Sequence, residues 1–267
     1  MKHALIFVGF FLICIALSSE LVKYAILPFC TGANYDTKVL HTLLSSILYS
    51  TIILVTFIGL KWCPVSGYYI SSKPVGVLSL VSLLSLTLIL PPTWMLELLP
   101  DKWTKNIIAE IVDKLLRIPE GYIVIGIAAP LVEEVVFRGA ILRKLLEWMK
   151  DSFEFTNQKA WIAIAISSLF FSAIHFNPAQ IPHAFLCGLL LGWLYYRTGS
   201  IIPGFIFHWI NNSMPFLLVW LFPDVKTDAK LIEYFGGDET ALIMSVIVST
   251  IVAILCIMQL NRMMKRA

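Results

Sequence analysis

Residues 129–139 read APLVEEVVFRG and place two carboxylates and an arginine inside an otherwise apolar run. A charged side chain at the centre of a membrane helix costs at least about 2.5 kcal/mol, so such a residue indicates a functional site. Glu134 and Arg138 lie four positions apart and share one helix face, whereas Glu133 points about 100° away. The pattern predicts that Glu134 and Arg138 form an ion pair and leave Glu133 for chemistry. The alternative is one structural network of all three charges.

The composition is typical of a membrane protein. The chain has 267 residues, of which 58% are hydrophobic and 14% charged. We therefore predict a single integral membrane domain over residues 1–267, an all-α polytopic helix bundle with a polar intramembrane cavity. The net charge of +3 is too small to indicate a nucleic-acid partner. The five cysteines are scattered, without a C-x-x-C pair, and indicate neither a disulfide framework nor a zinc site.

Eight stretches are long and apolar enough to span a bilayer. Since lipid offers the backbone no hydrogen-bond partners, each is expected to be a helix of about 20 residues. Lys and Arg between the spans favour a cell-membrane protein with both termini in the cytoplasm. The first span resembles a signal peptide, but we favour an uncleaved helix because apolar residues continue to Leu27. The expected spans are 4–28, 39–60, 75–95, 121–146, 158–176, 181–197, 201–222 and 240–260.

Two connections between spans have a distinct character. Residues 101–117 are expected to form an amphipathic helix in the membrane interface, ended by Pro119. This helix could also gate lateral access of a substrate. The acidic connection over residues 223–239 is expected to be solvated.

Two other spans carry polar residues at helical spacing. Phe171 and His175 share a face near the end of the fifth span, and His208 and Asn212 share a face of the seventh. Hydrogen bonding between helices is one interpretation, because polar groups in lipid need partners in the bundle interior. His41 and His183 lie near span starts, where interfacial placement explains them.

Together these polar groups can support hydrolysis of a peptide bond. Glu133 can act as a general base on water, and His175 can hold and polarise that water. His208 and Asn212 can donate hydrogen bonds to an oxyanion. No cofactor is required, although a zinc site of Glu133, His175 and His208 is an alternative. The sequence has no H-E-x-x-H motif and no serine-protease nucleophile turn within a span.

The three signatures, E-E-x-x-x-R at 133–138, F-x-x-x-H at 171–175 and H-x-x-x-N at 208–212, resemble those of the CPBP family. This CAAX-protease and bacteriocin-processing (Abi) family contains intramembrane glutamic endopeptidases similar to the type II CAAX prenyl endopeptidase. The resemblance covers residues 121–216, the expected catalytic core. It implies water activation by Glu133 and His175, an oxyanion hole of His208 and Asn212, and metal independence. Structural support would come from Glu134, Arg138 and Phe171.

The predicted function is therefore hydrolysis of a membrane-associated peptide or protein. A non-proteolytic membrane scaffold or regulator is the main alternative. A transporter is a weaker one, because the sequence lacks paired broken helices in two halves. One geometric problem remains for the protease: with straight helices, Glu133 lies ~18 Å from the outer end of its span, whereas His175 lies near the outer end of its own. The two can meet only if the fifth span extends, tilts or is offset.

Overall fold

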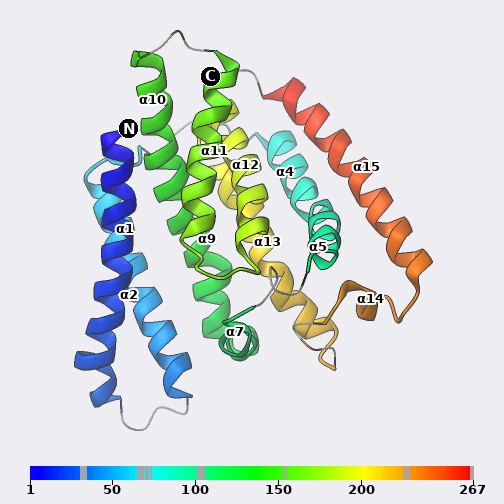
Figure 1. Cartoon of the computed structure of the whole chain (residues 1–267), viewed down its shortest axis with the longest axis horizontal. Coiled ribbons are helices and arrows are strands. Elements are labelled where there is room, and N and C mark those ends of the chain that lie inside the picture. The colour runs from blue at the N-terminus through cyan, green and yellow to red at the C-terminus, as the bar shows by residue number, and fades with distance from the viewer. Residues whose placement is uncertain are drawn as a thin grey trace.

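A computed structural model describes residues 1–30, 35–64, 69, 72, 74–100, 106–152, 154, 156–224, 226 and 229–264. Within these ranges all regular structure is helical, which confirms the predicted all-α bundle (Figure 1). The helices of the first half are α1 (Lys2–Leu21), η1 (Val22–Ile26), η2 (Leu27–Phe29), α2 (Thr37–Gly59), α4 (Val75–Thr87), α5 (Leu90–Glu97), α7 (Ala109–Leu116), α8 (Pro119–Gly121) and η3 (Tyr122–Ala128). Those of the second half are α9 (Ala129–Glu133), η4 (Glu134–Leu142), α10 (Arg143–Ser152), α11 (Asn157–Ala173), α12 (Ile181–Thr198), α13 (Ile202–Leu221), α14 (Leu231–Tyr234) and α15 (Glu239–Met263).

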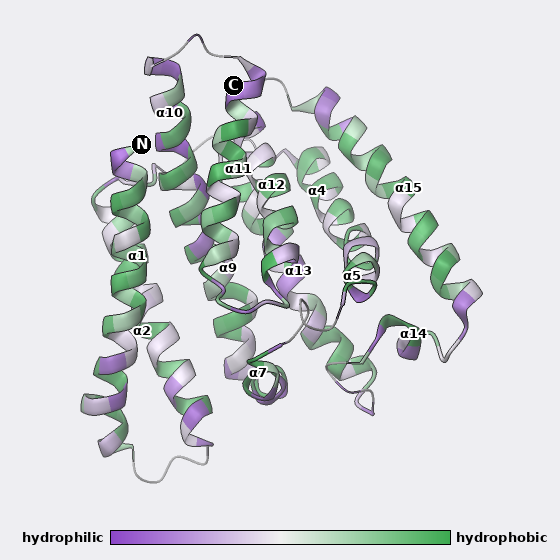
Figure 2. Ribbon diagram, viewed as in Figure 1, coloured by the Kyte–Doolittle hydropathy of each residue, from purple (hydrophilic) through white to green (hydrophobic). Residues whose placement is uncertain are grey.

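Within the part of the chain that the structure describes, four helical segments are long and apolar enough to cross a membrane. They are Lys2–Phe29, Thr37–Gly59, Val75–Glu97 and Glu239–Met263. Figure 2 shows hydrophobic residues along the lengths of α1 and α15, with hydrophilic residues near the helix ends, the pattern expected of helices in contact with lipid. The full set of eight spans remains a prediction.

The first helix begins and the last helix ends at the same end of the bundle, opposite the connection between α1 and α2 (Figure 1). The Arg197 guanidinium ties α12 to α15 at this end, because it donates to the carbonyl of Asn261 at 2.7 Å and to that of Met264. Both termini therefore lie on one side of the bundle. The cytoplasmic location of that side remains a prediction.

The helix that carries both glutamates lies at the centre of the bundle. It runs without interruption through α8, η3, α9, η4 and α10, and every residue of η4 is buried. Pro130 has no N–H to donate to the carbonyl of Gly126, and the wide π-helical turns of η3 directly precede α9. Aromatic rings close the core around η4: Phe137 lies 5.6 Å from Phe11 and 5.4 Å from Phe171, measured between ring centroids.

Two glycines allow α11 and α12 to pack at short distance. A Cβ on Gly188 would lie 2.8 Å from the Ser168 Cβ, and one on Gly192 would lie 2.7 Å from the Ile164 Cγ2. Small residues bring membrane helices close together in this way. The connection between α11 and α12 lies well inside the bundle, short of the end at which α1 joins α2, and α7 lies beyond it (Figure 1). The fifth span is thus offset along the bundle, one of the arrangements that would let His175 reach the depth of Glu133.

The two distinctive connections differ from their predictions in part. The amphipathic segment forms α7 from Ala109, while its first residues, 101–105, lie outside the described residues. The prediction of a solvated connection over 223–239 holds only in part, because the connection contains the short helix α14. Leu231 of α14 is buried and packs with Leu242 and Val246 of α15; residues 225, 227 and 228 lie outside the description.

Candidate active site

Glu134 and Arg138 form a buried ion pair. Arg138 Nη1 donates to Glu134 Oε1 at 2.8 Å, and the two side chains are 1% and 0% exposed. The guanidinium carbon also lies 4.3 Å from the centroid of the Phe171 ring, and Nη2 lies 3.4 Å from the Gly188 carbonyl oxygen. This confirms the pair predicted from helical spacing. One such pair removes two uncompensated charges from the apolar core.

His208 lies between the two carboxylates. Its Nδ1 is 3.2 Å from Glu134 Oε1 and its Nε2 is 3.5 Å from Glu133 Oε2. A carboxylate oxygen accepts, so the Nδ1–H of His208 donates a hydrogen bond to Glu134 Oε1. Glu133 is 16% exposed, in contrast to the fully buried Glu134. The glutamate that is not paired with arginine is therefore the one that solvent can reach.

A glycine lets α13 approach the glutamates closely enough for this contact. A Cβ on Gly204 would lie only 2.7 Å from Glu134 Oε2. One helical turn further along, the Ser85 hydroxyl donates to the Phe207 carbonyl at 2.8 Å and fixes α13 against α4. The residue beside Phe207 is His208, so the position of its imidazole is set from both α9 and α4.

His175 joins the same cluster through Phe171. Its Nδ1 lies 2.9 Å from the Phe171 carbonyl oxygen, which can only accept. Nδ1 therefore carries the proton, and in the neutral ring Nε2 is the nitrogen with the free lone pair. The Phe171 ring centroid is 5.1 Å from the His175 ring and 5.7 Å from the His208 ring. All three sequence signatures thus meet at one place, although the glutamate contacts belong to His208 and not to His175.

Asn212 faces the helix that carries the glutamates. Its Nδ2 donates to the Ile125 carbonyl of η3 at 3.1 Å. The amide has two N–H groups, and this bond uses one of them. Asn212 thus lies one helical turn from His208 on α13 and is in contact with η3.

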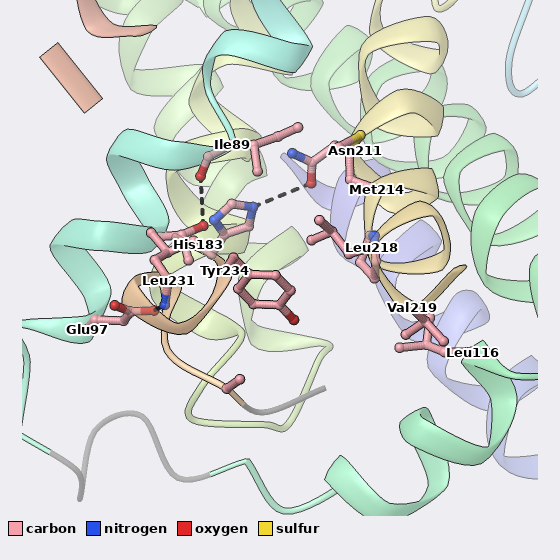
Figure 3. Close-up of a pocket in the computed structure, with 13 residues that line it drawn as sticks. Ile89, Glu97, Leu116, His183, Asn211, Met214, Leu218, Val219, Leu231 and Tyr234 are labelled. Atoms are coloured by element: carbon pink, nitrogen blue, oxygen red, sulfur yellow. Dashed lines mark hydrogen bonds between the residues drawn. The ribbon is translucent and has the colours of Figure 1, made fainter. Parts of the chain in front are cut away.

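A second polar pair on α13 and α12 escaped the sequence analysis, which assigned His183 to the membrane interface. His183 Nε2 lies 3.4 Å from Asn211 Oδ1 and 3.3 Å from Cys187 Sγ. His183 and Asn211 both line a cavity of about 240 Å³ between α5, α13 and α14 (Figure 3). The helical spacing of His183 and Cys187, and the second asparagine beside Asn212, were the available signals. The predicted catalytic residues are not among those that line this cavity.

The zinc alternative lacks an assembled ligand set. Among the residues that the structure describes, no three His, Cys, Asp or Glu side chains are grouped so that they could hold a metal ion.

Comparison with known proteins gives one match. Residues 118–214 match the family model described as type II CAAX prenyl endopeptidase Rce1-like. This segment is similar to the proteins of that family. The match contains all seven predicted site residues and agrees with the resemblance seen in the three signatures. The match supports, in general terms, a CAAX-type peptidase role for the chain. No curated protein and no solved structure matches the chain.

Proposed function

We propose that this protein is an intramembrane glutamic endopeptidase that cleaves a membrane-associated peptide or protein. The supporting observation is the position of the His208 imidazole, in contact with Glu133 on one side and Glu134 on the other. Phe171 adds the His175 ring to this group. A partly exposed carboxylate in contact with one imidazole, with a second imidazole packed on the same phenylalanine ring, is suited to the activation of water.

In the proposed reaction, Glu133 removes a proton from a water molecule. His175 orients that water through Nε2, because its Nδ1–H is donated to the Phe171 carbonyl. The oxygen of the water attacks the scissile carbonyl carbon and forms a tetrahedral oxyanion. His208, with a proton on each ring nitrogen, donates from Nε2 to this oxyanion, and Asn212 donates its second N–H to it. When the C–N bond breaks, the proton held by Glu133 passes to the leaving amine.

Glu134 and Arg138 take no part in bond making in this proposal. Glu134 Oε1 accepts from both Arg138 and His208, so it fixes which His208 nitrogen faces the substrate. Arg138 balances the charge of Glu134, which leaves Glu133 to carry the proton. The mechanism uses no metal ion, so activity should survive EDTA.

The test is cleavage of membrane peptides by the purified protein in lipid nanodiscs. Glu133→Gln and His175→Gln should each lower kcat by at least about 100-fold, since each removes an acid–base or water-orienting group. Glu147→Gln is the matched control, because Glu147 forms an ion pair with Arg143 away from the site, and it should retain the wild-type rate. Wild-type kcat in either site variant would contradict the mechanism. Full cellular function of Glu133→Gln would instead favour the scaffold alternative.

A further inference from the structure

Asn177 lies in the turn between α11 and α12, two residues after His175, and is completely buried. Its side chain makes two hydrogen bonds to the segment before α7. Oδ1 accepts from the Ile107 backbone N–H at 3.3 Å, and Nδ2 donates to Asn106 Oδ1 at 2.9 Å. The Asn177 carbonyl also accepts from the N–H groups of Gln180 and Ile181, at 2.9 and 3.2 Å, where α12 begins. One residue therefore joins the His175 turn to two other elements.

The residue between His175 and Asn177 has a backbone conformation that its own side chain does not favour. Phe176, the single residue between them, has φ +48°, a region that residues with a Cβ rarely adopt. Its side chain is 70% exposed, so packing of the ring inside the protein does not fix this backbone. The His175 and Phe176 N–H groups donate to the Ser172 and Ala173 carbonyls within the turn, and the side-chain hydrogen bonds of Asn177 fasten the turn to another element.

The segment to which Asn177 is hydrogen-bonded, directly before α7, is itself held in place. Asn106 Oδ1 accepts a second hydrogen bond, from the N–H of Ile108, the residue directly before α7, at 3.2 Å. Leu115 of α7 is buried with Val39 and Leu43 of α2. Because α7 is packed against α2 through Leu115, the residues at its start can position the His175 turn.

We propose that Asn177 is a positioning residue that aligns His175 with Glu133 by fastening the His175 turn to the start of α7. The inference rests on the proposed function, in which His175 orients the attacking water. It also gives the amphipathic helix a defined link to the site: displacement of α7 moves His175. Asn177 itself touches neither the water nor the substrate.

Asn106 provides the cleanest test, because it is exposed and its replacement leaves the core intact. Asn106→Ala removes the acceptor of both hydrogen bonds, and Asn106→Asp retains it. We expect Asn106→Ala and Asn177→Ala to lower kcat between about 10- and 100-fold with KM within about two-fold, since small misplacement of a catalytic group affects the chemical step. Asn106→Asp should restore most of the activity. Asn157→Ala, an exposed asparagine at the opposite end of α11, is the matched control and should resemble wild type.

An NMR readout separates this inference from the protease assignment. In protein labelled at its five histidines, the His175 imidazole signal should move in Asn106→Ala and return in Asn106→Asp, while the His41 signal stays unchanged. Unmoved His175 signals in both alanine variants, or a wild-type kcat in both, would overturn the positioning role. A moved His175 signal in a protein that cleaves no peptide would support the positioning role and overturn the proposed protease function.

Discussion

Glu134 Oε1 accepts hydrogen bonds from two cations or potential cations, the Arg138 guanidinium and the His208 imidazole. This oxygen matters for both fold and chemistry, because it neutralises a buried arginine and also orients the His208 ring through Nδ1. The pairing with Arg138 follows from local spacing along one helix. The contact with His208 joins residues 74 positions apart, and no local pattern determines it.

Removal of one partner from this ion pair should destabilise the protein strongly. Arg138→Met leaves the Glu134 carboxylate buried without its cation, which costs about 3–5 kcal/mol. The double variant Glu134→Gln/Arg138→Met removes both charges and should recover a large part of that loss, since Gln can still accept from His208. Chemical unfolding in detergent measures both variants. A loss below about 1 kcal/mol in Arg138→Met would contradict the buried pair.

The residues that sequence analysis missed are those whose partners come from distant elements. His183 has a weak local signal, its spacing to Cys187, but its contact with Asn211 depends on how α12 and α13 pack. Asn177 carries no signal at all, since a single asparagine before a proline is typical of any turn. The contacts that could be predicted join residues four positions apart. Glu134 and Arg138 lie on one helix, and His175 lies in the turn directly after α11, four residues from Phe171.

At the scale of elements, the offset of α11 decides whether the signatures meet. Apolar run length predicts that a helix exists at residues 158–176 but not its height in the bundle. That height follows from the fit of Gly188 and Gly192 against Ser168 and Ile164, which involves two helices. The type of helix could not be predicted either. Hydrophobic periodicity does not distinguish the π-helical turns of η3 and η4 from α-helix, and Pro130 is the one local signal of an altered hydrogen-bond pattern.

The contact between α7 and α2 should depend on pH. The Asp36 carboxylate, which caps α2, pairs with Lys114 of α7 at 3.1 Å, and Lys114 also pairs with Glu110 at 2.8 Å. The hydrogen bond from Lys114 lowers the pKa of Asp36 and of Glu110. A carboxyl whose folded pKa is depressed stabilises the folded state above its unfolded pKa, and this contribution is lost as pH falls through the folded value.

We therefore expect amide exchange in α7 to accelerate when pH falls from about 6 to about 3, after correction for the intrinsic pH dependence of exchange. Hydrogen exchange with mass spectrometry measures this. Asp36→Asn should show faster exchange in α7 already at the higher pH and a smaller change on acidification. Equal protection of α7 at both pH values in the wild-type protein would show that these carboxylates do not hold the helix.

At the scale of the whole molecule, the bundle has a basic end. The helix α10, which begins with Arg143 and Lys144, lies toward the end at which α1 begins and α15 ends, whereas α7 lies toward the opposite end (Figure 1). Arg197 of α12 is hydrogen-bonded to the end of α15. Loops rich in Lys and Arg remain in the cytoplasm. We therefore predict that both termini are cytoplasmic and that α7 lies at the other face of the membrane.

Labelling of single introduced cysteines in intact cells tests this orientation. Glu110→Cys reports on the exposed face of α7, and Asp151→Cys reports on the exposed end of α10. Both are introduced into a Cys30→Ser background, which lacks one partly accessible native thiol. A membrane-impermeant maleimide should label residue 110 in intact cells, and residue 151 only after permeabilisation. The reverse pattern would place α7 and the turn that follows His175 toward the cytoplasm, so that the proposed site would draw its water and its substrate from inside the cell.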